Sequence, residues 1–255
     1  MRRFLVSISF IAGFLTCFMV QAESVTVSAP LRFATEPTYP PFEYHNNQGQ
    51  LDGFDIALAQ ALCDRLMRRC EFVEQPFNTI LSGLRLGAYD AAIAALDIND
   101  SRLQLMSFTQ PYLANSAVLL VNRDVVTGDT ISKENLVGVQ TGTTLMNFVV
   151  DGRLGADVTP LPYASYEEAF GDLQAGNIDA VFTDQAVALN WLSQHPKGRW
   201  QVLGEPYTAP EYFGQGLGIA LSKQNYRLKL ALDNALDALR ADGTLQALQK
   251  KYLHH

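Results

Sequence analysis

Two stretches of this chain share one pattern: "LRLGAYDAAIAAL" at residues 84–96 and "LQAGNIDAVFTDQ" at residues 173–185. They align without a gap as L-x-x-G-x-x-D-A followed by an apolar run. Each pattern predicts a helix that ends at a glycine, Gly87 or Gly176, and then a tight turn and a buried strand. Helix–glycine–strand joints also recur in any α/β protein, which is the alternative interpretation. A genuine repeat means that the chain holds two similar α/β halves.

The segments on either side of the repeat alternate between strand-like and helix-like patterns. This alternation predicts an α/β protein with largely parallel sheets. Residues 54–67 have leucines at i, i+4 spacing, and Ser165 with Glu168 forms a predicted capping box for another helix. The C-terminal segment is predicted to be helical except for a break at Gly243. The expected strands are 31–35, 70–75, 89–95, 116–122, 136–140, 158–162, 178–183, 200–203 and 216–221.

The two halves would place equivalent strand ends at Ala95 and Asp184. In open α/β sheets, ligands bind beyond the carboxyl ends of the strands, where loops and helix N-termini converge. A site between the halves would therefore be lined by residues 94–102 on one side and by residues from 184 onward on the other.

The first 22 residues resemble an export signal. Arg2 and Arg3 precede an apolar run that extends to Val20, with small residues near Ala22, which predicts a secretory signal peptide at residues 1–22. The alternative is a membrane anchor, because about 17 apolar residues lie at the short end of the spanning range. Cleavage would leave 17 basic and 26 acidic side chains, a net charge of −9, on a protein exported to the periplasm.

Composition and spacing argue against several functional classes. No later apolar run is long enough to span a bilayer, and no basic cluster indicates a nucleic-acid partner. The four histidines are His45 in a polar loop, His195 beside Pro196 and the terminal His254 and His255, which argues against a histidine-based mechanism. No nucleophile–base pair, paired acids or metal cluster has convincing spacing. We therefore expect no enzyme, no cofactor and no metal.

Cys63 and Cys70 are the cysteines that remain after the predicted cleavage. They lie at the end of a predicted helix and at the start of the next predicted strand, so a disulfide is sterically reasonable in an oxidising compartment. Two buried thiols are the alternative.

Charges of both signs lie at predicted strand ends. Arg102 follows the strand at 89–95 through a short helix start capped by Asn99 or Asp100, and its guanidinium offers a forked pair of donors for a carboxylate. Asp184, at the end of another buried strand, could hold an ammonium group. The alternatives are a solvated helix arginine and a simple helix cap.

Two further segments offer ligand-binding groups. "TGTT" at 141–144 leads from a strand into a helix, so its N–H groups and hydroxyls can face an anion, although ordinary threonine capping explains it equally well. Glu36, Tyr39 and Phe77 each follow a predicted strand, and two rings with a carboxylate can hold a flat cation. Packing in the core is the commoner role of such rings.

Five motifs, in order, resemble the periplasmic polar amino-acid binding proteins of ABC importers. They are "ATEPTYPPFEY…GQLDGFDIALAQALC", "YDAAIAALDINDSR…MSFTQPYL", "GVQTGTT", "GNIDAVFTD" and "YFGQGLGIAL…LRADGTLQALQKKY". The resemblance is nearest to the arginine and the lysine/arginine/ornithine/histidine binders. It implies an α/β fold of type II with two lobes, each a mostly parallel sheet flanked by helices, and two crossover strands as the hinge. Lobe one would be 23–113 plus 214–255, and lobe two 114–213.

The same resemblance implies a role for each candidate site residue. Arg102 would hold the ligand α-carboxylate, helped by N–H groups near Ala95 and at Thr144. Asp184 and the Ala94 carbonyl would hold the α-ammonium group. Tyr39 and Phe77 would sandwich the side chain, with Glu36 near its charged end. The full expected ligand-binding set is Glu36, Tyr39, Phe77, Ala94, Ala95, Asp97, Arg102, Gln140, Gly142, Thr144 and Asp184.

The chain departs from the basic-amino-acid binders beside Arg102. Ala94, Ala95 and Asp97 stand where some relatives carry serines, so fewer hydroxyls are available. Asp97 would repel a bound carboxylate unless it turns toward Arg102 or caps the next turn. Prolines 37, 40 and 41 limit the conformations of the loop that carries Glu36 and Tyr39, which lowers the ordering cost of binding.

The resulting hypothesis is a monomeric periplasmic receptor that binds a basic L-amino acid, most favourably L-arginine, and delivers it to the membrane subunits of an ABC importer. One rival is a periplasmic enzyme on the same fold, similar to cyclohexadienyl dehydratase. A second rival is a ligand-sensing module that signals to a membrane partner.

Overall fold

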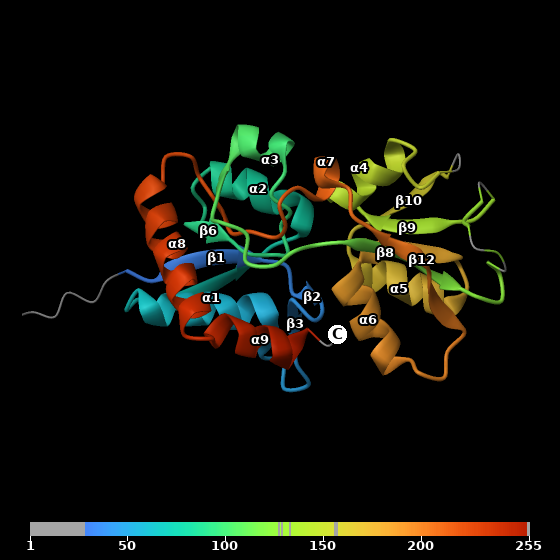
Figure 1. Ribbon diagram of the computed structural model, residues 1–255, viewed down its shortest axis with the longest axis horizontal. Coiled ribbons are helices and arrows are strands. Elements are labelled where there is room, and N and C mark those ends of the chain that lie inside the picture. The colour runs from blue at the N-terminus through green and yellow to red at the C-terminus, as the bar shows by residue number, and fades with distance from the viewer. Residues whose placement is uncertain (1–28, 127, 129, 133, 156–157, 254–255) are drawn as a thin grey trace, which may run out of the picture.

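The structure is a computed structural model that describes residues 29–126, 128, 130–132, 134–155 and 158–253. The predicted signal peptide lies outside these residues. Two five-stranded sheets lie toward opposite ends of the long axis (Figure 1). The chain passes between them where it enters β8 (Ala117–Asn122) and again near the short helix α7 (Pro210–Phe213), and these two helix-flanked sheets are the cores of the two halves.

The first sheet has the strand order β5-β1-β6-β13-β7. Its first two pairings are parallel and its last two are antiparallel, so this sheet is mixed rather than largely parallel. Helices α1, α8 and α9 lie on one side of it and α2 and α3 on the other (Figure 1). The strands are β1 (Leu31–Thr35), β5 (Cys70–Glu74), β6 (Ala91–Ala92), β7 (Ser107–Phe108) and β13 (Ala220–Leu221). The helices are α1 (Phe54–Arg65), α2 (Phe77–Arg85), α3 (Asp100–Leu105), α8 (Tyr226–Ala241) and α9 (Thr244–Tyr252).

The second sheet has the order β10-β9-β11-β8-β12 and is also mixed, with β8 antiparallel to both of its neighbours. The predicted cap at the start of α5 is present, because Ser165 Oγ accepts the Glu168 N–H at 3.2 Å. The Glu168 carboxylate bonds to the N–H of Ala164 rather than to that of Ser165, so the capping box is shifted by one residue. The strands are β8 (Ala117–Asn122), β9 (Val137–Gln140), β10 (Pro160–Tyr163), β11 (Ala180–Asp184) and β12 (Trp200–Tyr207). The helices are α4 (Thr144–Val150), α5 (Tyr166–Ala175), α6 (Gln185–Gln194) and α7 (Pro210–Phe213).

A small third sheet was not expected from the sequence. It joins β2 (Thr38–Tyr39), β3 (Glu43–His45) and β4 (Leu51–Asp52) in antiparallel order. Gly53 makes this arrangement possible, because its φ of 126° is open to glycine and a Cβ there would collide with the backbone of Phe42. The proline-rich loop is thus part of a short hairpin that leads into α1.

Two expected strands are shorter than predicted. The segment predicted as 89–95 pairs only at Ala91–Ala92, and Ala95 has a φ of 44°, which is incompatible with an extended strand. The segment predicted as 216–221 pairs as a strand only at Ala220–Leu221. Gly216 has a φ of 112°, and a Cβ there would collide with the carbonyl of Leu113.

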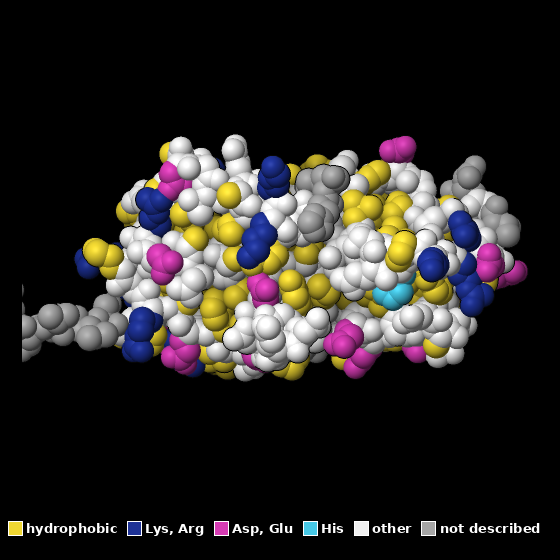
Figure 2. All heavy atoms as spheres, turned by 90° about the horizontal axis from the view of Figure 1, so that it is seen from below, with side chains coloured by type: hydrophobic (Ala, Val, Ile, Leu, Met, Phe, Trp, Pro, Cys, Tyr) yellow, Lys and Arg dark blue, Asp and Glu magenta, His cyan; other side chains and the backbone are white. Residues whose placement is uncertain are grey.

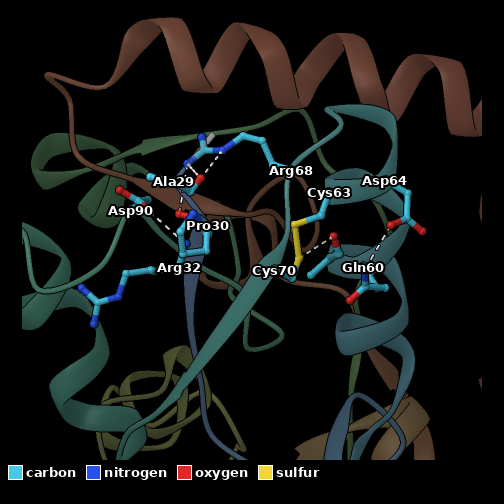
Figure 3. The surroundings of a disulfide bond; sticks show 10 residues. Ala29, Pro30, Arg32, Gln60, Cys63, Asp64, Arg68, Cys70 and Asp90 are labelled. Atoms are coloured by element: carbon cyan, nitrogen blue, oxygen red, sulfur yellow. Dashed lines mark hydrogen bonds between the residues drawn. A yellow bond between two sulfur atoms is a disulfide. The ribbon is translucent and has the colours of Figure 1, made fainter. Parts of the chain in front are cut away.

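The predicted disulfide between Cys63 and Cys70 is confirmed, with a Cα–Cα distance of 5.8 Å. It ties the end of α1 to the start of β5 (Figure 3). Arg68, in the connecting turn, donates from Nη2 to the carbonyl oxygens of Ala29 at 2.9 Å and Pro30 at 3.1 Å. The bridge and the arginine together fix the beginning of β1 beside α1.

Charged side chains on the face shown in Figure 2 are scattered, with Lys or Arg and Asp or Glu interspersed among apolar atoms. Among the described residues, no helix has the length and the apolar character that crossing a membrane requires.

Candidate functional site

A cavity of about 10 Å³ lies where loops of the two sheets meet. From the side of the first sheet it is lined by Tyr39, Phe77, Ala95, Asp97 and Arg102. From the side of the second sheet it is lined by Gln140, Thr143, Thr144, Leu145, Tyr166 and Asp184. The two equivalent strand ends of the sequence repeat therefore meet at one site.

Hydrogen bonds join the two sides around this cavity. Asn115, in the segment that enters β8, donates from Nδ2 to Asp97 Oδ1 at 2.8 Å and to Asp184 Oδ1 at 2.9 Å. Tyr39 OH donates to Asp184 Oδ2 at 2.7 Å, and the Thr144 hydroxyl donates to Asp97 Oδ2. Both oxygens of Asp97 and both oxygens of Asp184 thus accept a hydrogen bond.

The two site carboxylates have altered acidity. Burial raises the pKa of Asp97 to about 6, although Arg102 and the hydrogen bonds from Thr144 and Asn115 lower it. Burial, followed by the charge of Asp97, raises the pKa of Asp184 to about 7. Two carboxylates so close together favour the binding of a positive charge, which would relieve their mutual repulsion.

Arg102 supplies the positive charge of the site. Asn99 caps α3 by accepting the Arg102 backbone N–H at 2.9 Å, which confirms one of the two predicted caps. The guanidinium donates from Nη1 to the backbone carbonyl of Asp97 at 3.1 Å, and its carbon lies 5.9 Å from the Phe77 ring centroid. Burial lowers the Arg102 pKa, but an arginine keeps its charge at neutral pH. This buried fork is suited to a carboxylate.

The start of α4 differs in detail from the expected threonine cap. Thr143 is the N-cap: its Oγ1 accepts the Met146 N–H at 3.0 Å and donates to the Gln140 carbonyl at 2.7 Å. Because Thr143 makes the cap, the Thr144 hydroxyl donates to Asp97 instead. Gly142 does not line the cavity; its φ is 81°, and a Cβ there would lie 3.2 Å from the Asn78 Cβ of the other side.

Glu36 lies just behind the cavity wall. Its two carboxylate oxygens each accept from Gln140 Nε2 at 2.9 Å, and the same nitrogen lies 3.0 Å from the Ala164 carbonyl oxygen. Burial raises the pKa of Glu36. Gln140 thus stands between this acid and the cavity.

The aromatic wall contains one ring that the sequence analysis missed. Tyr39 stacks on Tyr166 with ring centroids 5.1 Å apart, and Tyr166 OH donates to the Phe182 carbonyl at 2.9 Å. Phe77, the first residue of α2, lies beneath Arg102. The sequence signal for Tyr166 is its position: it directly follows the helix cap at Ser165, as Thr144 directly follows the cap at Thr143.

Most of the expected ligand-binding residues gather at this cavity. Glu36, Ala94 and Gly142 stand outside its lining, and Thr143, Leu145 and Tyr166 are additional lining residues. The Ala95 N–H, expected to face a ligand, donates instead to Asp55 Oδ2 at 2.8 Å. Asp184 stands at the N-cap position of α6, yet its side chain makes no cap and serves the cavity instead. No group of three His, Cys, Asp or Glu side chains among the described residues could hold a metal.

Comparison with known proteins gives consistent matches. Residues 31–255 match the family described as bacterial extracellular solute-binding proteins, family 3. The putative ABC transporter arginine-binding protein 2 of Escherichia coli (strain K12) is 39% identical over 229 residues, covering 90% of this chain and 93% of that protein. The histidine-binding periplasmic protein of Salmonella typhimurium is 34% identical over 255 residues, covering 99% and 97%.

A solved structure of a Salmonella typhimurium periplasmic binding protein, described for its high arginine specificity, superposes with a TM-score of 0.82. It is 33% identical, and the match covers 89% of this chain and 100% of that one. These matches confirm the expected two-lobed α/β fold. They also confirm the expectation of a binding protein rather than an enzyme.

Proposed function

Since this chain belongs to the bacterial extracellular solute-binding proteins of family 3, we propose that it captures a basic L-amino acid, most favourably L-arginine, in the periplasm. It acts as a monomer and delivers its ligand to the membrane subunits of an ABC importer. Its lobes are residues 23–113 with 214–255, and residues 114–213, and the ligand binds between them.

The observation that carries this proposal is the pairing of opposite charges around one cavity. Arg102 and Asp184 both line it, and both are buried. A free amino acid has a carboxylate and an ammonium group on one carbon, so a site that buries it needs one partner of each sign. In our proposal Arg102 receives the α-carboxylate, and Asp184 with Asp97 receives the α-ammonium group.

The preference for a basic side chain follows from the charge balance. Glu36, Asp97 and Asp184 place three buried carboxyl groups at or behind the cavity, against one guanidinium. A ligand with a cationic side chain reduces this excess, whereas an acidic one would increase it. The names of relatives, among them an arginine-binding and a histidine-binding protein, support the same choice.

Closure over the ligand uses contacts that already span the cavity. Tyr39 and Asp97 on one side bond to Asp184 and Thr144 on the other, and Asn115 bonds to both acids. We propose that a ligand takes over part of this network when the lobes close. Affinity on the order of 0.01–1 μM, about −8 to −11 kcal/mol, would suit such a receptor.

A thermal-shift screen tests the proposal. The protein is heated with each of the twenty amino acids, ornithine and citrulline, because a ligand at about 1,000 times its Kd stabilises the folded state by about 4 kcal/mol. We expect L-arginine to raise the Tm most, lysine and ornithine less, and citrulline, which is nearly isosteric but uncharged, much less. A largest shift with glutamate or aspartate, or no shift with any of these ligands, would contradict the proposal.

A further inference from the structure

Two acids are buried beside the cavity without lining it. Glu43 lies in β3 and Asp55 in the first turn of α1, with exposed fractions of 1% and 0%. Glu43 Oε2 and Asp55 Oδ1 are both buried, and no N–H or hydroxyl of the described residues donates to either atom. Buried polar atoms nearly always have a hydrogen-bond partner, so these two call for an explanation.

The other oxygen of Asp55 connects three parts of the fold. Asp55 Oδ2 accepts the Ala95 N–H at 2.8 Å and the Tyr112 hydroxyl at 2.9 Å. Ala95 lines the cavity with a φ of 44°, a left-handed conformation that non-glycine residues seldom adopt. Tyr112 closely precedes the segment that crosses to the second sheet. Asp55 therefore supports a strained residue at the cavity wall.

Several acidic side chains lie near Glu43. Beyond burial, the charges that raise its pKa are those of Asp55, Glu36 and Asp184. Tyr112, the remaining titratable group at the pair, is a neutral hydroxyl whose pKa is itself raised by burial. Two buried carboxyl groups without a cation cannot both be ionised at low cost.

Of the two acids, Glu43 is the one better suited to be protonated. Burial raises its pKa well above the ordinary range, and the charge of the neighbouring Asp55 raises it further. Burial also raises the pKa of Asp55, to about 7, but the hydrogen bonds from Ala95 and Tyr112 act in the opposite direction. Because Asp55 accepts two donors while Glu43 Oε2 has none, the ionised form is better placed on Asp55.

We propose that Glu43 is protonated at neutral pH and that its O–H group donates a hydrogen bond to Asp55. The resulting acid pair positions Ala95 at the wall of the binding cavity. One proton then provides a partner for both orphaned oxygens. Glu43 is a positioning residue, since it acts on the ligand only through Asp55 and Ala95. The effect on ligand affinity rests on the proposed function, whereas the sharing of the proton does not.

Two variants distinguish the role of the donated hydrogen bond from that of the Glu43 carboxyl group. Glu43→Gln keeps the shape and carries a permanent N–H donor, so we expect the Kd for L-arginine at pH 7 to stay within about threefold of wild type. Glu43→Leu has no donor and leaves the buried Asp55 Oδ1 without a partner, so the Kd should rise at least about tenfold. Glu205→Gln, which removes an exposed carboxyl group from β12, is the matched control and should change neither the Kd nor the Tm.

The pH dependence of stability tests directly whether Glu43 is protonated in the folded state. Glu43 has a raised pKa in the folded state, so its stabilisation is complete below the ordinary glutamate range and is lost as pH rises through the raised value. The Tm of ligand-free wild type should therefore fall relative to that of Glu43→Gln as pH rises from about 5 to about 7. A Tm difference that does not change with pH over this window would overturn the proposal.

Infrared difference spectra provide a second readout, which decides the matter even if Glu43→Leu does not fold. Wild type minus Glu43→Gln at pH 7 should show the C=O band of a protonated carboxylic acid, and its absence would also overturn the proposal. The stability and infrared measurements are made without a ligand, so they do not rest on the proposed function. If wild type fails to bind any basic amino acid, the proposed function fails while these measurements still decide whether the pair shares a proton.

Discussion

Replacing Arg102 with alanine tests the proposed clamp for the ligand carboxylate. The Arg102 side chain is 8% exposed, so a ligand group that it binds is removed from water. Within the described part of the chain, its guanidinium makes one hydrogen bond, from Nη1 to the Asp97 carbonyl, and an arginine has five N–H donors. Donors therefore remain for a carboxylate at this site.

The expected loss can be estimated from those contacts. A hydrogen bond to a charged group contributes about 1.5–3 kcal/mol, and a two-pronged contact makes two of them. Part of the loss is recovered if water or the Thr144 hydroxyl reaches the carboxylate, so we expect Arg102→Ala to weaken arginine binding by at least about 2 kcal/mol. This corresponds to about a 30-fold increase in Kd.

Titration calorimetry at neutral pH is the assay, with two companion variants. Arg102→Lys keeps the charge but loses the fork and should fall between wild type and alanine. Arg153→Ala removes an arginine that stacks on Tyr212 at the surface and should leave the Kd unchanged. An Arg102→Ala protein that folds normally and binds arginine with the wild-type Kd would refute the clamp.

Three further predictions concern other groups around the cavity. Glu36→Gln should weaken arginine binding by about 1–2 kcal/mol and glutamine binding by less; equal losses in calorimetry would remove Glu36 from a role in specificity. The folded-state pKa values of Asp97 and Asp184 are raised to about 6 and about 7. Their contribution to ligand-free stability is therefore lost as pH rises from the ordinary aspartate range through these raised values. The Tm increase caused by arginine, whose ammonium group needs ionised partners, should therefore be larger at pH 8 than at pH 5.5, and equal increases would argue against this pairing. Asn115→Asp should lower the ligand-free Tm more at pH 8 than at pH 5.5, since it replaces two donated hydrogen bonds with a third carboxylate. The neighbouring Ser116→Ala, which loses only a bond to Gln185, is the control and should show no such pH dependence.

Local sequence patterns predicted the features that depend on local physics. Gly87 and Gly176 were expected to end helices, and both have φ values in the left-handed region, 75° and 80°. The cap at Asn99 and the disulfide followed from residue type and position. Arg102 and Asp184 were predicted to lie at one site because each follows a predicted strand, and both line the cavity.

The remaining features depend on contacts distant in sequence. The first sheet is mixed because β13 runs antiparallel to β6 and β7, and the second because β8 runs antiparallel to β11 and β12, and no local pattern specifies which strands pair. Tyr166 appeared to be an ordinary first helical residue, but its ring stacks on Tyr39, more than a hundred residues away. Glu43 and Asp55 have the residue type of surface groups, so their burial follows only from the hairpin and helix that meet there.

Titration calorimetry with L-arginine and two analogues tests the central claim most directly, since the claim is that opposite charges on facing lobes bind both ends of one amino acid. Agmatine lacks the α-carboxylate that Arg102 would bind, and argininic acid lacks the α-ammonium group that Asp184 would bind. We expect one arginine per chain with a Kd on the order of 1 μM or tighter, and a Kd at least about 30-fold weaker for each analogue. Equal affinity for arginine and either analogue would contradict the account.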